Sequence, residues 1–411
     1  MPRADLVVYN IGELATFPAK PLSRVSEETA GIRRGAGIAV RGGRVVEVGS
    51  SEAIRGRYDA AEYVNAEGRF ASPGLVDPHT HLVFAGSRED EFEMKLMGYS
   101  YSEILERGGG IYRTVEATRR ASLGELAARA RRVLKLMMDG GTTAVEVKSG
   151  YGLYPEDELK QLEAAALASS GLPVRIVATV LAHVVPREHM EDRGRYVELF
   201  KEIVREAAAR GLATYVDVFC DRGAFTVEET REIVKAGLDA GLRARIHADQ
   251  LSYIGCSKLA AELPLDSLDH LEKMPAENAE VLARAGSVAV LTPTSILAMR
   301  EEAKPPVEAL RRAGVPIAVA SDYNPNNMTP LQQTAMDLST HLLGLTPLEA
   351  LAAATVNAAW SLRIEGGQVV EGAPADLVVW DFDNHKWVGY SWGYNKAVAV
   401  VVQGQLWRNE L

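Results

Sequence analysis

The chain has 411 residues, of which 47% are hydrophobic and 24% are charged, and this composition is typical of a globular protein with one large and one smaller domain. Its formal net charge of −10 argues against nucleic acid or an anionic membrane as a partner. The first residues contain no apolar core of signal-peptide length, and no run approaches the roughly 18 apolar residues of a membrane span. We therefore expect a cytoplasmic protein.

Both ends of the chain predict short β-strands. In residues 1–65, the runs DLVVYN, GAGIAVRGGRVVEVG and AEYVNAEGRF alternate apolar and polar residues between glycine-rich turns. Residues 361–411 return to this pattern with ADLVVWDF and KAVAVVVQGQLW. Two β-rich ends around a different middle predict one small β-sandwich domain that is built from both termini.

The middle of the chain, residues 66–360, alternates strands with helices. Most of the strands are apolar on both faces, as buried parallel strands must be. Eight strands are expected, and they end near Val76, Val147, Leu181, Phe219, Ile246, Leu268, Leu291 and Ala320. Eight alternating units favour an α/β fold of the (β/α)₈ TIM-barrel type. An open doubly wound sheet is the alternative, because the number of strands does not prove closure.

Several helices carry readable start and stop signals. Ser122 and Glu125 have the spacing of a capping box before ELAARARRVLKLMM, and Gly140 follows that helix. Thr226 and Glu229 repeat the pattern before ETREIVKAGLDAG. These signals fix where two of the helices of the middle region begin.

The longest connection without a clear strand follows the first strand of the middle region and covers residues 82–120. It contains ERGGGI, with three consecutive glycines. Long connections of this kind in compact domains are usually functional. We interpret the segment as a lid or a substrate-binding segment.

Five of the eight histidines follow the predicted ends of strands, and an aspartate does the same after the last strand. These residues are His79, His81, His183, His247, His270 and Asp322. A barrel gathers the carboxyl ends of its strands at one rim, where the active sites of such barrels lie. We therefore expect these six side chains to converge.

His79, His81, His247 and Asp322 are predicted to bind a metal ion. Alternate residues of a strand face the same side, so His79 and His81 can both face the barrel mouth. Imidazole and carboxylate ligands suit Zn²⁺ or iron, as Fe²⁺ or Fe³⁺. The opposing interpretation is a chance His-x-His among rim histidines that bind nothing, and the agreement of five strand ends with an aspartate argues against it.

One metal ion is expected rather than two. Binuclear amidohydrolases usually take a bridging lysine or acid from the end of the fourth strand, but here that strand reads TYVDVFCDRG and ends at Cys220. We interpret Cys220 as a packed core residue rather than a ligand or nucleophile. The only other cysteine is Cys256, and two thiols in a chain of this length do not indicate a disulfide framework, so we expect both to be reduced.

The remaining polar candidates have less distinct roles. His270 can hydrogen-bond the attacking water or the carbonyl that it attacks, or it can be an ordinary rim histidine. Lys148 follows the second strand, and a structural salt bridge is as good an interpretation as a direct role. The other histidines, His189, His341 and His385, lie on helical or loop segments and are treated as background.

Six stretches together resemble the imidazolonepropionases, a family of amidohydrolases in histidine degradation. They are HTHLVFAGSREDEFEMKL, ERGGGIYRTVEATR, EVKSGYGL, DVFCDRGAFT, IHADQLS and DHLE. The resemblance covers residues 73–330, and the two β-rich ends fit the small domain of that family. It implies hydrolysis of the ring carbon–nitrogen bond of 4-imidazolone-5-propanoate to N-formimino-L-glutamate.

The resemblance also implies roles for individual residues. Arg88 would hold the propanoate carboxylate, for which a bidentate guanidinium is suited. Gln250 would hydrogen-bond the ring and belongs with Asp322 and His270 to the catalytic group. The other substrate-binding residues would be Tyr151, His183, Asn324, Asn326 and Asn327.

The chain departs from the family pattern at two places. After the last strand the family usually reads Asp-x-Asn-Pro-Gly-Thr/Ser-Ser-Pro, whereas this chain reads DYNPNNMTP and has Asn326 in place of glycine. Asparagine tolerates a positive φ better than most residues, so the turn can survive. After the seventh strand, LTPTSILAM replaces a Pro-Gly-aromatic stretch. Both departures lie near the expected substrate and bear on substrate preference more than on the metal.

The expected mechanism has a metal-activated water, Asp322 as the acceptor of its proton, and hydroxide attack on the ring carbonyl. The nearest rival is a deaminase of the same fold, or a hydrolase of another cyclic amide. Deaminases typically carry glutamate three residues after the fifth-strand histidine, and Gln250 at that position cannot supply a proton.

A non-catalytic scaffold is the rival from another class, but scaffolds usually lose ligands, and all four are present. The only expected partners are a small-molecule substrate and a second copy of the chain, since a C₂ homodimer is the commonest assembly.

Overall fold

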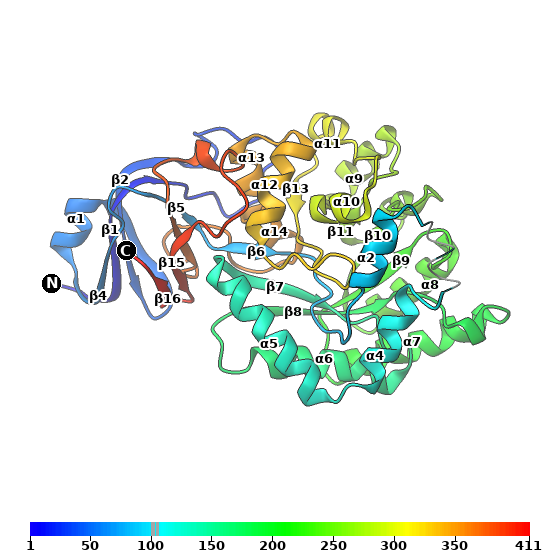
Figure 1. The fold of residues 1–411 in the computed structure, drawn as a ribbon. Coiled ribbons are helices and arrows are strands. Elements are labelled where there is room, and N and C mark those ends of the chain that lie inside the picture. The colour runs from blue at the N-terminus through cyan, green and yellow to red at the C-terminus, as the bar shows by residue number, and fades with distance from the viewer. Residues whose placement is uncertain (100–102, 104–106) are drawn as a thin grey trace.

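The computed structural model describes residues 1–99, 103 and 107–411. Figure 1 shows two units, a small sheet at one end that contains both termini and a larger α/β unit beside it. This arrangement confirms the predicted barrel with a small β unit formed from both ends of the chain.

The small unit is a single connected sheet with mostly antiparallel pairing. Its strands lie in the order β16-β15-β14-β5-β1-β2-β3, and β4 pairs with β1 in parallel. Their bounds are β1 Arg3–Leu14, β2 Arg33–Arg41, β3 Arg44–Ser50, β4 Asp59–Asn65, β5 Phe70–Pro73, β14 Leu377–Trp380, β15 Ala397–Val402 and β16 Gln405–Asn409. The alternating runs at both ends therefore became neighbouring strands of one sheet.

Strand β5 joins the two ends of the chain, because it pairs with β1 on one side and with β14 on the other. Ser72 of β5 accepts a hydrogen bond from the buried indole of Trp380 at 2.9 Å. Two residues after β5 the chain enters the barrel at β6. The sheet is thus attached directly to the first barrel strand.

The larger unit contains eight parallel strands in sequence order. They are β6 Leu75–Asp77, β7 Thr142–Lys148, β8 Arg175–Ala182, β9 Tyr215–Cys220, β10 Arg243–Ala248, β11 Leu265–His270, β12 Val288–Leu291 and β13 Ile317–Val319. A parallel bridge between Thr80 and Tyr323 connects the chain just beyond β6 and β13. The predicted strand ends agree with these bounds within two residues, and the nearly closed barrel excludes the open-sheet alternative.

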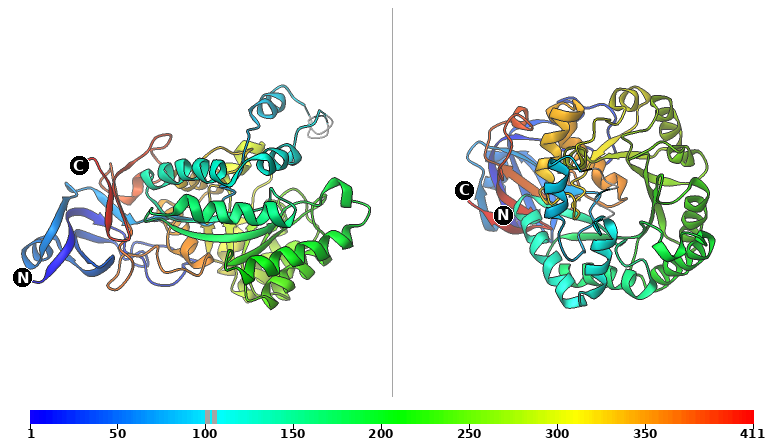
Figure 2. Two further views of the ribbon diagram at one scale, coloured as in Figure 1. Left: turned by 90° about the horizontal axis from the view of Figure 1, so that it is seen from below. Right: turned by 45° about the vertical axis from the view of Figure 1, so that its right-hand side comes forward.

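Helices surround these strands, as the end-on view in Figure 2 shows. The helices of the described residues are α1 Ser51–Arg57, α2 Glu89–Leu96, α4 Ile111–Arg120, α5 Leu123–Asp139, α6 Pro155–Ser169, α7 Arg193–Ala209, α8 Val227–Asp239, α9 Ala279–Ala285, α10 Pro293–Met299, α11 Val307–Ala313, α12 Gln332–Leu343, α13 Pro347–Ala353 and α14 Val356–Ser361, with 3₁₀ turns η1 Arg187–His189, η2 Cys256–Ala261, η3 Ala276–Asn278 and η4 His385–Trp387. Ser122 and Thr226 form both predicted capping boxes, at the starts of α5 and α8.

The segment expected to be a lid contains α2 and α4. The left view in Figure 2 shows α2 projecting beyond the ring of helices. Gly110 precedes α4 with a φ of 88°, a left-handed conformation that favours glycine and explains one of the three consecutive glycines. Residues 100–102 and 104–106 of this segment lie outside the described residues.

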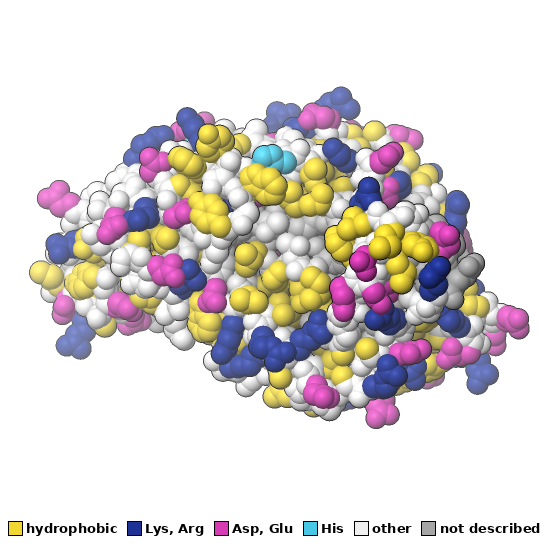
Figure 3. All heavy atoms as spheres, in the orientation of Figure 1, with side chains coloured by type: hydrophobic (Ala, Val, Ile, Leu, Met, Phe, Trp, Pro, Cys, Tyr) yellow, Lys and Arg dark blue, Asp and Glu magenta, His cyan; other side chains and the backbone are white. Residues whose placement is uncertain are grey.

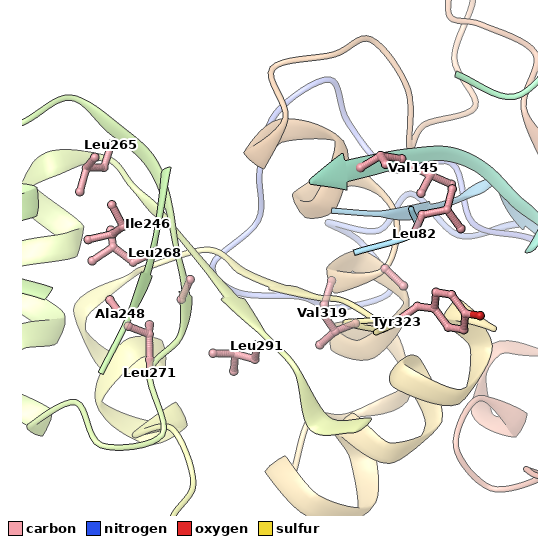
Figure 4. Packing of buried hydrophobic residues seen from close by; sticks show 14 of the residues in the cluster. Leu82, Val145, Ile246, Ala248, Leu265, Leu268, Leu271, Leu291, Val319 and Tyr323 are labelled. Carbon is pink, nitrogen blue, oxygen red and sulfur yellow. The ribbon is translucent and has the colours of Figure 1, made fainter. Parts of the chain in front are cut away.

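The main apolar core lies around the barrel strands and beneath the helices. Figure 4 shows Ile246, Leu265 and Leu268 of β10 and β11 packed together, and Leu82 beside Val145. All five are almost completely buried. Close packing of such buried side chains between strands and helices holds the strands in place, and the ends of these strands carry the site residues.

The surface and the helix lengths bear on possible partners. On the face drawn in Figure 3, acidic and basic side chains are interspersed among apolar ones. Among the helices that the structure describes, none combines the length and the apolar character that a membrane crossing requires.

The expectation of two reduced thiols is wrong for this structure. Cys220, the last residue of β9, forms a disulfide with Cys256, the first residue of η2. The two residues are 36 positions apart in the sequence, so the folded chain brings them together. Cys220 is completely buried, as expected, but it is a cross-link and not simply a packed thiol.

Candidate active site

The four predicted metal ligands converge at the carboxyl ends of the barrel strands. Oδ1 of Asp322 lies 3.5 Å from Nε2 of both His79 and His81, and Nε2 of His247 lies 3.4 Å from Nε2 of His81. Ligands about 2.0–2.1 Å from a tetrahedral ion are roughly 3.3 Å apart, so this spacing fits a single cation. All four residues are at most 3% exposed.

The protonation of these histidines also fits a cation. Burial, together with nearby cationic and imidazole groups, holds the pKa values of His79 and His81 well below the ordinary value, so both rings are neutral. Among the described residues, Nε2 of His79 is buried without a hydrogen-bond partner. A buried, neutral, unpartnered imidazole nitrogen that faces three other ligand atoms is what a metal ion would complete.

Two buried carboxylates lie close to the far nitrogens of two of the proposed ligand histidines. Asp269 lies 2.6 Å from Nδ1 of His79, and Asp217 lies 3.0 Å from Nδ1 of His247. Lys148 contacts Asp217 at 2.7 Å, and Arg245 contacts Asp269 at 2.6 Å. Lys148 is therefore part of a structural ion network beneath the ligands. Carboxylates in this position fix the tautomer and orientation of a ligating histidine.

His270 lies beside the ligand cluster. One of its ring nitrogens falls within 4.8 Å of ligand atoms of His79 and Asp322. Burial lowers the pKa of His270, but Glu272 and Asp322 outweigh it, so the pKa is raised. His270 and Asp322 have φ values of 78° and 45°, rare for residues other than glycine, and such backbone strain concentrates at functional sites.

A cavity of ≈ 540 Å³ opens above the ligand cluster. Every residue that the sequence assigned to the site lines this cavity except His79 and Asn327. Arg88, Lys95 and Arg300 face it, whereas Asp322 at its base is the only acidic residue among the described residues of its lining. The cavity is therefore suited to a small anionic molecule.

Arg88 is already engaged by a neighbouring carboxylate. Its Nε and Nη2 donate to Oε2 of Glu91 at 2.8 and 2.5 Å, and the other oxygen of Glu91 accepts from the backbone N–H of Gly110 at 2.9 Å. Both side chains are buried. Glu91 therefore fixes the guanidinium at the edge of the cavity, between α2 and the start of α4.

Tyr151 and His183 form an aromatic wall of the cavity. The ring of His183 stacks on His81 with centroids 5.1 Å apart, and the ring of Tyr151 lies 5.3 Å from that of His183. Burial lowers the pKa of His183 to about 3, so this ring is neutral. Gln250 lies at the rim, where its amide is 3.9 Å from the sulfur of Met299.

The three asparagines after β13 occupy different positions. Asn324 donates to Oδ1 of Asp322 at 3.1 Å and faces the cavity, and Asn326 accepts from Lys95 at 3.2 Å. Asn327 is buried and donates to the carbonyls of Ser321 and Asp322 at 2.8 and 3.1 Å, so its amide holds the turn together. The unusual DYNPNNMTP sequence thus forms a turn that asparagine side chains stabilise.

Sequence reasoning missed several residues of this site. Lys95, Ser295 and Arg300 line the cavity, and Asp217 and Asp269 support the ligands. A signal existed for the two aspartates, because a carboxylate inside an apolar buried strand needs a partner. Lys95 lies on α2 and Arg300 directly follows α10, and no local pattern distinguishes them from surface cations.

Comparisons with known proteins agree with this geometry. Residues 70–407 match the model of the Amidohydrolase family. The chain is 46% identical to the imidazolonepropionase of Pyrobaculum arsenaticum over 97% of this chain and 99% of that protein. It is 41% identical to the imidazolonepropionase of Aeromonas hydrophila, with 90% of each chain covered, and 40% identical to that of Geobacillus kaustophilus, with 97% and 96% covered.

Solved structures with lower identity share the fold. A triazine hydrolase variant superimposes with a TM-score of 0.76 at 18% identity, covering 99% of this chain and 95% of its own. A zinc-bound adenosine deaminase from Xanthomonas campestris gives a TM-score of 0.72 at 19% identity, covering 100% and 94%. At these identities the likeness concerns the architecture alone.

Proposed function

We infer that this chain, which belongs to the amidohydrolase family and within it to the imidazolonepropionases, hydrolyses the ring carbon–nitrogen bond of 4-imidazolone-5-propanoate. The product is N-formimino-L-glutamate. The observation that carries the inference is the meeting of three histidines and Asp322 at the base of a cavity lined by cationic side chains. A hydrolytic centre at the floor and cations at the wall match a small cyclic amide that bears a carboxylate.

One divalent cation, Zn²⁺ or iron, is proposed to be held by His79, His81, His247 and Asp322. When bound, such an ion lowers the pKa of a coordinated water toward neutrality and polarises a carbonyl. The last residue of the fourth barrel strand is the disulfide-bonded Cys220, and not a lysine or an acid that could bridge a second ion. One ion per chain is therefore the stoichiometry to test.

Asp322 and His270 are proposed to handle protons and charge in the reaction. Asp322 accepts a proton from the attacking water, whose oxygen adds to the ring carbonyl carbon. His270 donates a hydrogen bond to the carbonyl oxygen as negative charge develops there. The ring carbon–nitrogen bond then breaks, and the proton passes from Asp322 to the departing nitrogen. The oxygen of water ends in the new carboxyl group and one of its protons on the formimino nitrogen, while the other proton is released when the carboxyl group ionises.

Arg88 is proposed to bind the propanoate carboxylate. Its Nη1 makes no hydrogen bond to Glu91, which is bonded through Nε and Nη2. Lys95 adds a second cation on the same side of the cavity. Tyr151, His183 and Gln250 would contact the ring, and Asn324, Asn326 and Asn327 are proposed to bind or position the substrate or the product.

A direct assay tests this function. The purified protein is mixed with 4-imidazolone-5-propanoate, and loss of the ultraviolet absorbance of the ring is followed with and without added metal. We expect metal-dependent loss of absorbance and formation of N-formimino-L-glutamate. Hydrolysis of a different cyclic amide, with no action on this compound, would show that the substrate assignment is wrong.

A second experiment separates ring opening from deamination. Gln250→Glu introduces a side chain that can carry a proton at the position that deaminases use. We expect this variant to retain ring opening within roughly 10-fold of wild type, about 1.4 kcal/mol, and to release no ammonia from purines or pyrimidines. Ammonia release by the wild-type protein would favour a deaminase instead.

Further proposals concern the assembly and its surroundings. We propose a homodimer, the commonest symmetric assembly, located in the cytoplasm. Light scattering would distinguish a dimer from the 44.5 kDa monomer. Cell fractionation with thiol labelling would test the location, since a disulfide is unusual in a reducing compartment.

A further inference from the structure

The segment Thr292–Ser295, called here the hydroxyl segment, directly follows the seventh barrel strand. Thr292 follows β12, and α10 begins at Pro293. The segment belongs to the LTPTSILAM stretch, where this chain departs from the Pro-Gly-aromatic pattern of its family. The proposed function above gives it no role.

The hydroxyls of Ser295 and Thr292 contact Asp322 and His270, the two side chains that are proposed to handle protons and charge in the reaction. Ser295 donates a hydrogen bond to Oδ2 of Asp322, and Oγ1 of Thr292 lies 2.9 Å from Nδ1 of His270. Both hydroxyl residues are almost completely buried, and Ser295 also lines the cavity. Thr294, between them, donates to the carbonyl of Ser321.

The contact of Ser295 fixes how Asp322 faces the metal position. Oδ1 points to the two ligand histidines His79 and His81, at 3.5 Å from each, while Oδ2 points the other way to Ser295. Loss of the hydroxyl would release Oδ2, while Asn324 would still donate to Oδ1 at 3.1 Å. A hydroxyl can donate to a carboxylate and, after rotation, accept from a protonated carboxyl, so Ser295 partners Asp322 in both states of the proposed proton transfer.

The contact of Thr292 fixes the imidazole of His270. The hydroxyl of Thr292 also lies 3.4 Å from Oε1 of Glu272, whereas His270 itself is 3.7 Å from that carboxylate. Thr292 therefore bridges the two, accepting from Nδ1 of His270 and donating to Glu272. This arrangement leaves the other ring nitrogen of His270 outside the bridge, and His270 itself lines the cavity.

We propose that Ser295 and Thr292 are positioning residues of the hydrolytic site, Ser295 for Asp322 and Thr292 for His270. The proposal rests on the roles of Asp322 and His270 in the proposed function. The proposal assigns a role to the stretch that departs from the family pattern after the seventh strand, because its hydroxyls hold Asp322 and His270 in place. Residues that orient a metal ligand typically change metal affinity or activity 10- to 100-fold when they are removed.

The test compares Ser295→Ala, Ser295→Thr and Thr294→Val in the full-length protein. Thr294→Val is the matched control, because it removes a buried hydroxyl from the same turn that bonds only to a backbone carbonyl. We expect Ser295→Ala to lower kcat on 4-imidazolone-5-propanoate roughly 10- to 100-fold, to leave KM within about 3-fold, and to weaken Zn²⁺ binding roughly 10-fold. Ser295→Thr keeps a hydroxyl and should therefore retain most of the wild-type kcat and Zn²⁺ affinity.

Thr292→Val should show a different signature, namely a similar loss of kcat with Zn²⁺ binding unchanged, because His270 is not an assigned ligand. Thr292→Ser should restore the rate. Zn²⁺ affinity is measured by competition with a chromophoric chelator, so the effect on Asp322 can be read even if the wild-type protein acts on another substrate. Unchanged affinity and rate in Ser295→Ala, or equal losses in Thr294→Val, would overturn the proposal.

Discussion

Neutral imidazoles are what a divalent cation requires, and burial keeps His79 and His81 neutral. A free imidazolium cannot bind a metal, so a lowered pKa prepares both rings as ligands at ordinary pH. The carboxylates of Asp217 and Asp269 then direct the ligand nitrogens inward. Individual side chains therefore already have the state and orientation that the proposed ion needs.

Removing one ligand should remove the ion. We expect His247→Ala to bind far less than one metal ion per chain and to lose the thermal stabilisation that metal gives the wild-type protein. That stabilisation is about 2.7 kcal/mol when free metal is 100 times its Kd. Metal analysis and thermal unfolding with and without a chelator measure both effects. His189→Ala, outside the cavity, is the control, and two ions in wild type would refute the ligand set.

Arg88 is the residue on which we propose that substrate recognition depends. Arg88→Ala should lower kcat/KM by about 2–5 kcal/mol, the effect of removing one partner of a desolvated charge pair. Metal content should not change. The variant leaves Glu91 buried without its cation, so thermal unfolding must be measured alongside the kinetics.

Arg113→Ala is a suitable comparison for Arg88→Ala, because Arg113 pairs with Asp90 on the same segment but is exposed. It should leave kcat/KM nearly unchanged. Full activity of Arg88→Ala on 4-imidazolone-5-propanoate would show that another cation, such as Lys95, binds the carboxylate.

Between elements, the disulfide joins the end of β9 to the start of η2 and encloses β10, which carries His247. Strand β10 is also held by parallel pairing with β9 and β11. The disulfide therefore constrains the chain on both sides of β10, whereas the pairing of β10 with its neighbouring strands positions His247.

Loss of the disulfide should lower stability and spare the metal. The double variant Cys220→Ser with Cys256→Ser should lose up to about 4 kcal/mol of unfolding free energy, the loop-entropy value for a closed loop of this length. Denaturant unfolding measures the loss, and metal content should stay near one ion per chain. Two titratable thiols in the untreated native protein would show that the disulfide does not form.

Across the whole molecule, the residues of the proposed site lie at one end of the barrel axis and a group of stabilising contacts lies at the other. His270 ends β11 at the catalytic rim, whereas Asp266 lies near the opposite end of the same strand. Asp266 accepts hydrogen bonds from Arg243 and Arg363 at 2.8 Å and from Tyr215 at 3.1 Å. These contacts tie β9, β10 and β11 to the segment after α14, far from the cavity.

Asp266→Asn should therefore destabilise the fold and not the chemistry. Burial raises the pKa of Asp266, but the two arginines outweigh it, so its pKa lies below the ordinary value. The stabilisation is present above the unfolded pKa of about 3.9 and is lost as pH falls through the lower folded value. We expect a loss of about 1–3 kcal/mol near pH 7, since the arginines are partly exposed.

Denaturant unfolding of wild type and Asp266→Asn at several pH values checks this prediction. The difference between them should shrink below about pH 4, while the activity per bound metal ion stays equal. A difference that does not depend on pH would mean that the carboxylate charge is not what stabilises this end of the barrel.

The division at residues 65 and 360 stays a prediction. Pairing of β5 with β14 extends the small sheet to Pro73, so the sheet and the first barrel strand are nearly continuous. Limited proteolysis would show whether the three segments behave as separate units.

The sequence by itself determined the strand order, the helix starts at Ser122 and Thr226, and the four side chains that we propose as ligands. These features depend on local patterns, because an apolar run, a cap and a histidine at a strand end lie within a few residues of each other. A barrel then gathers all strand ends at one rim whatever the details of packing. The location of the proposed ligands at that rim could therefore be predicted without knowing any long-range contact.

Only the tertiary structure decided which distant side chains became partners. Asp269 meets His79 across 190 positions, Cys256 meets Cys220 across 36, and Ser295 meets Asp322 across 27. No local pattern encodes such pairs, since they depend on how neighbouring strands and helices are packed and turned. The sequence shows that a buried polar group needs a hydrogen-bond partner, but the tertiary packing determines which residue is that partner.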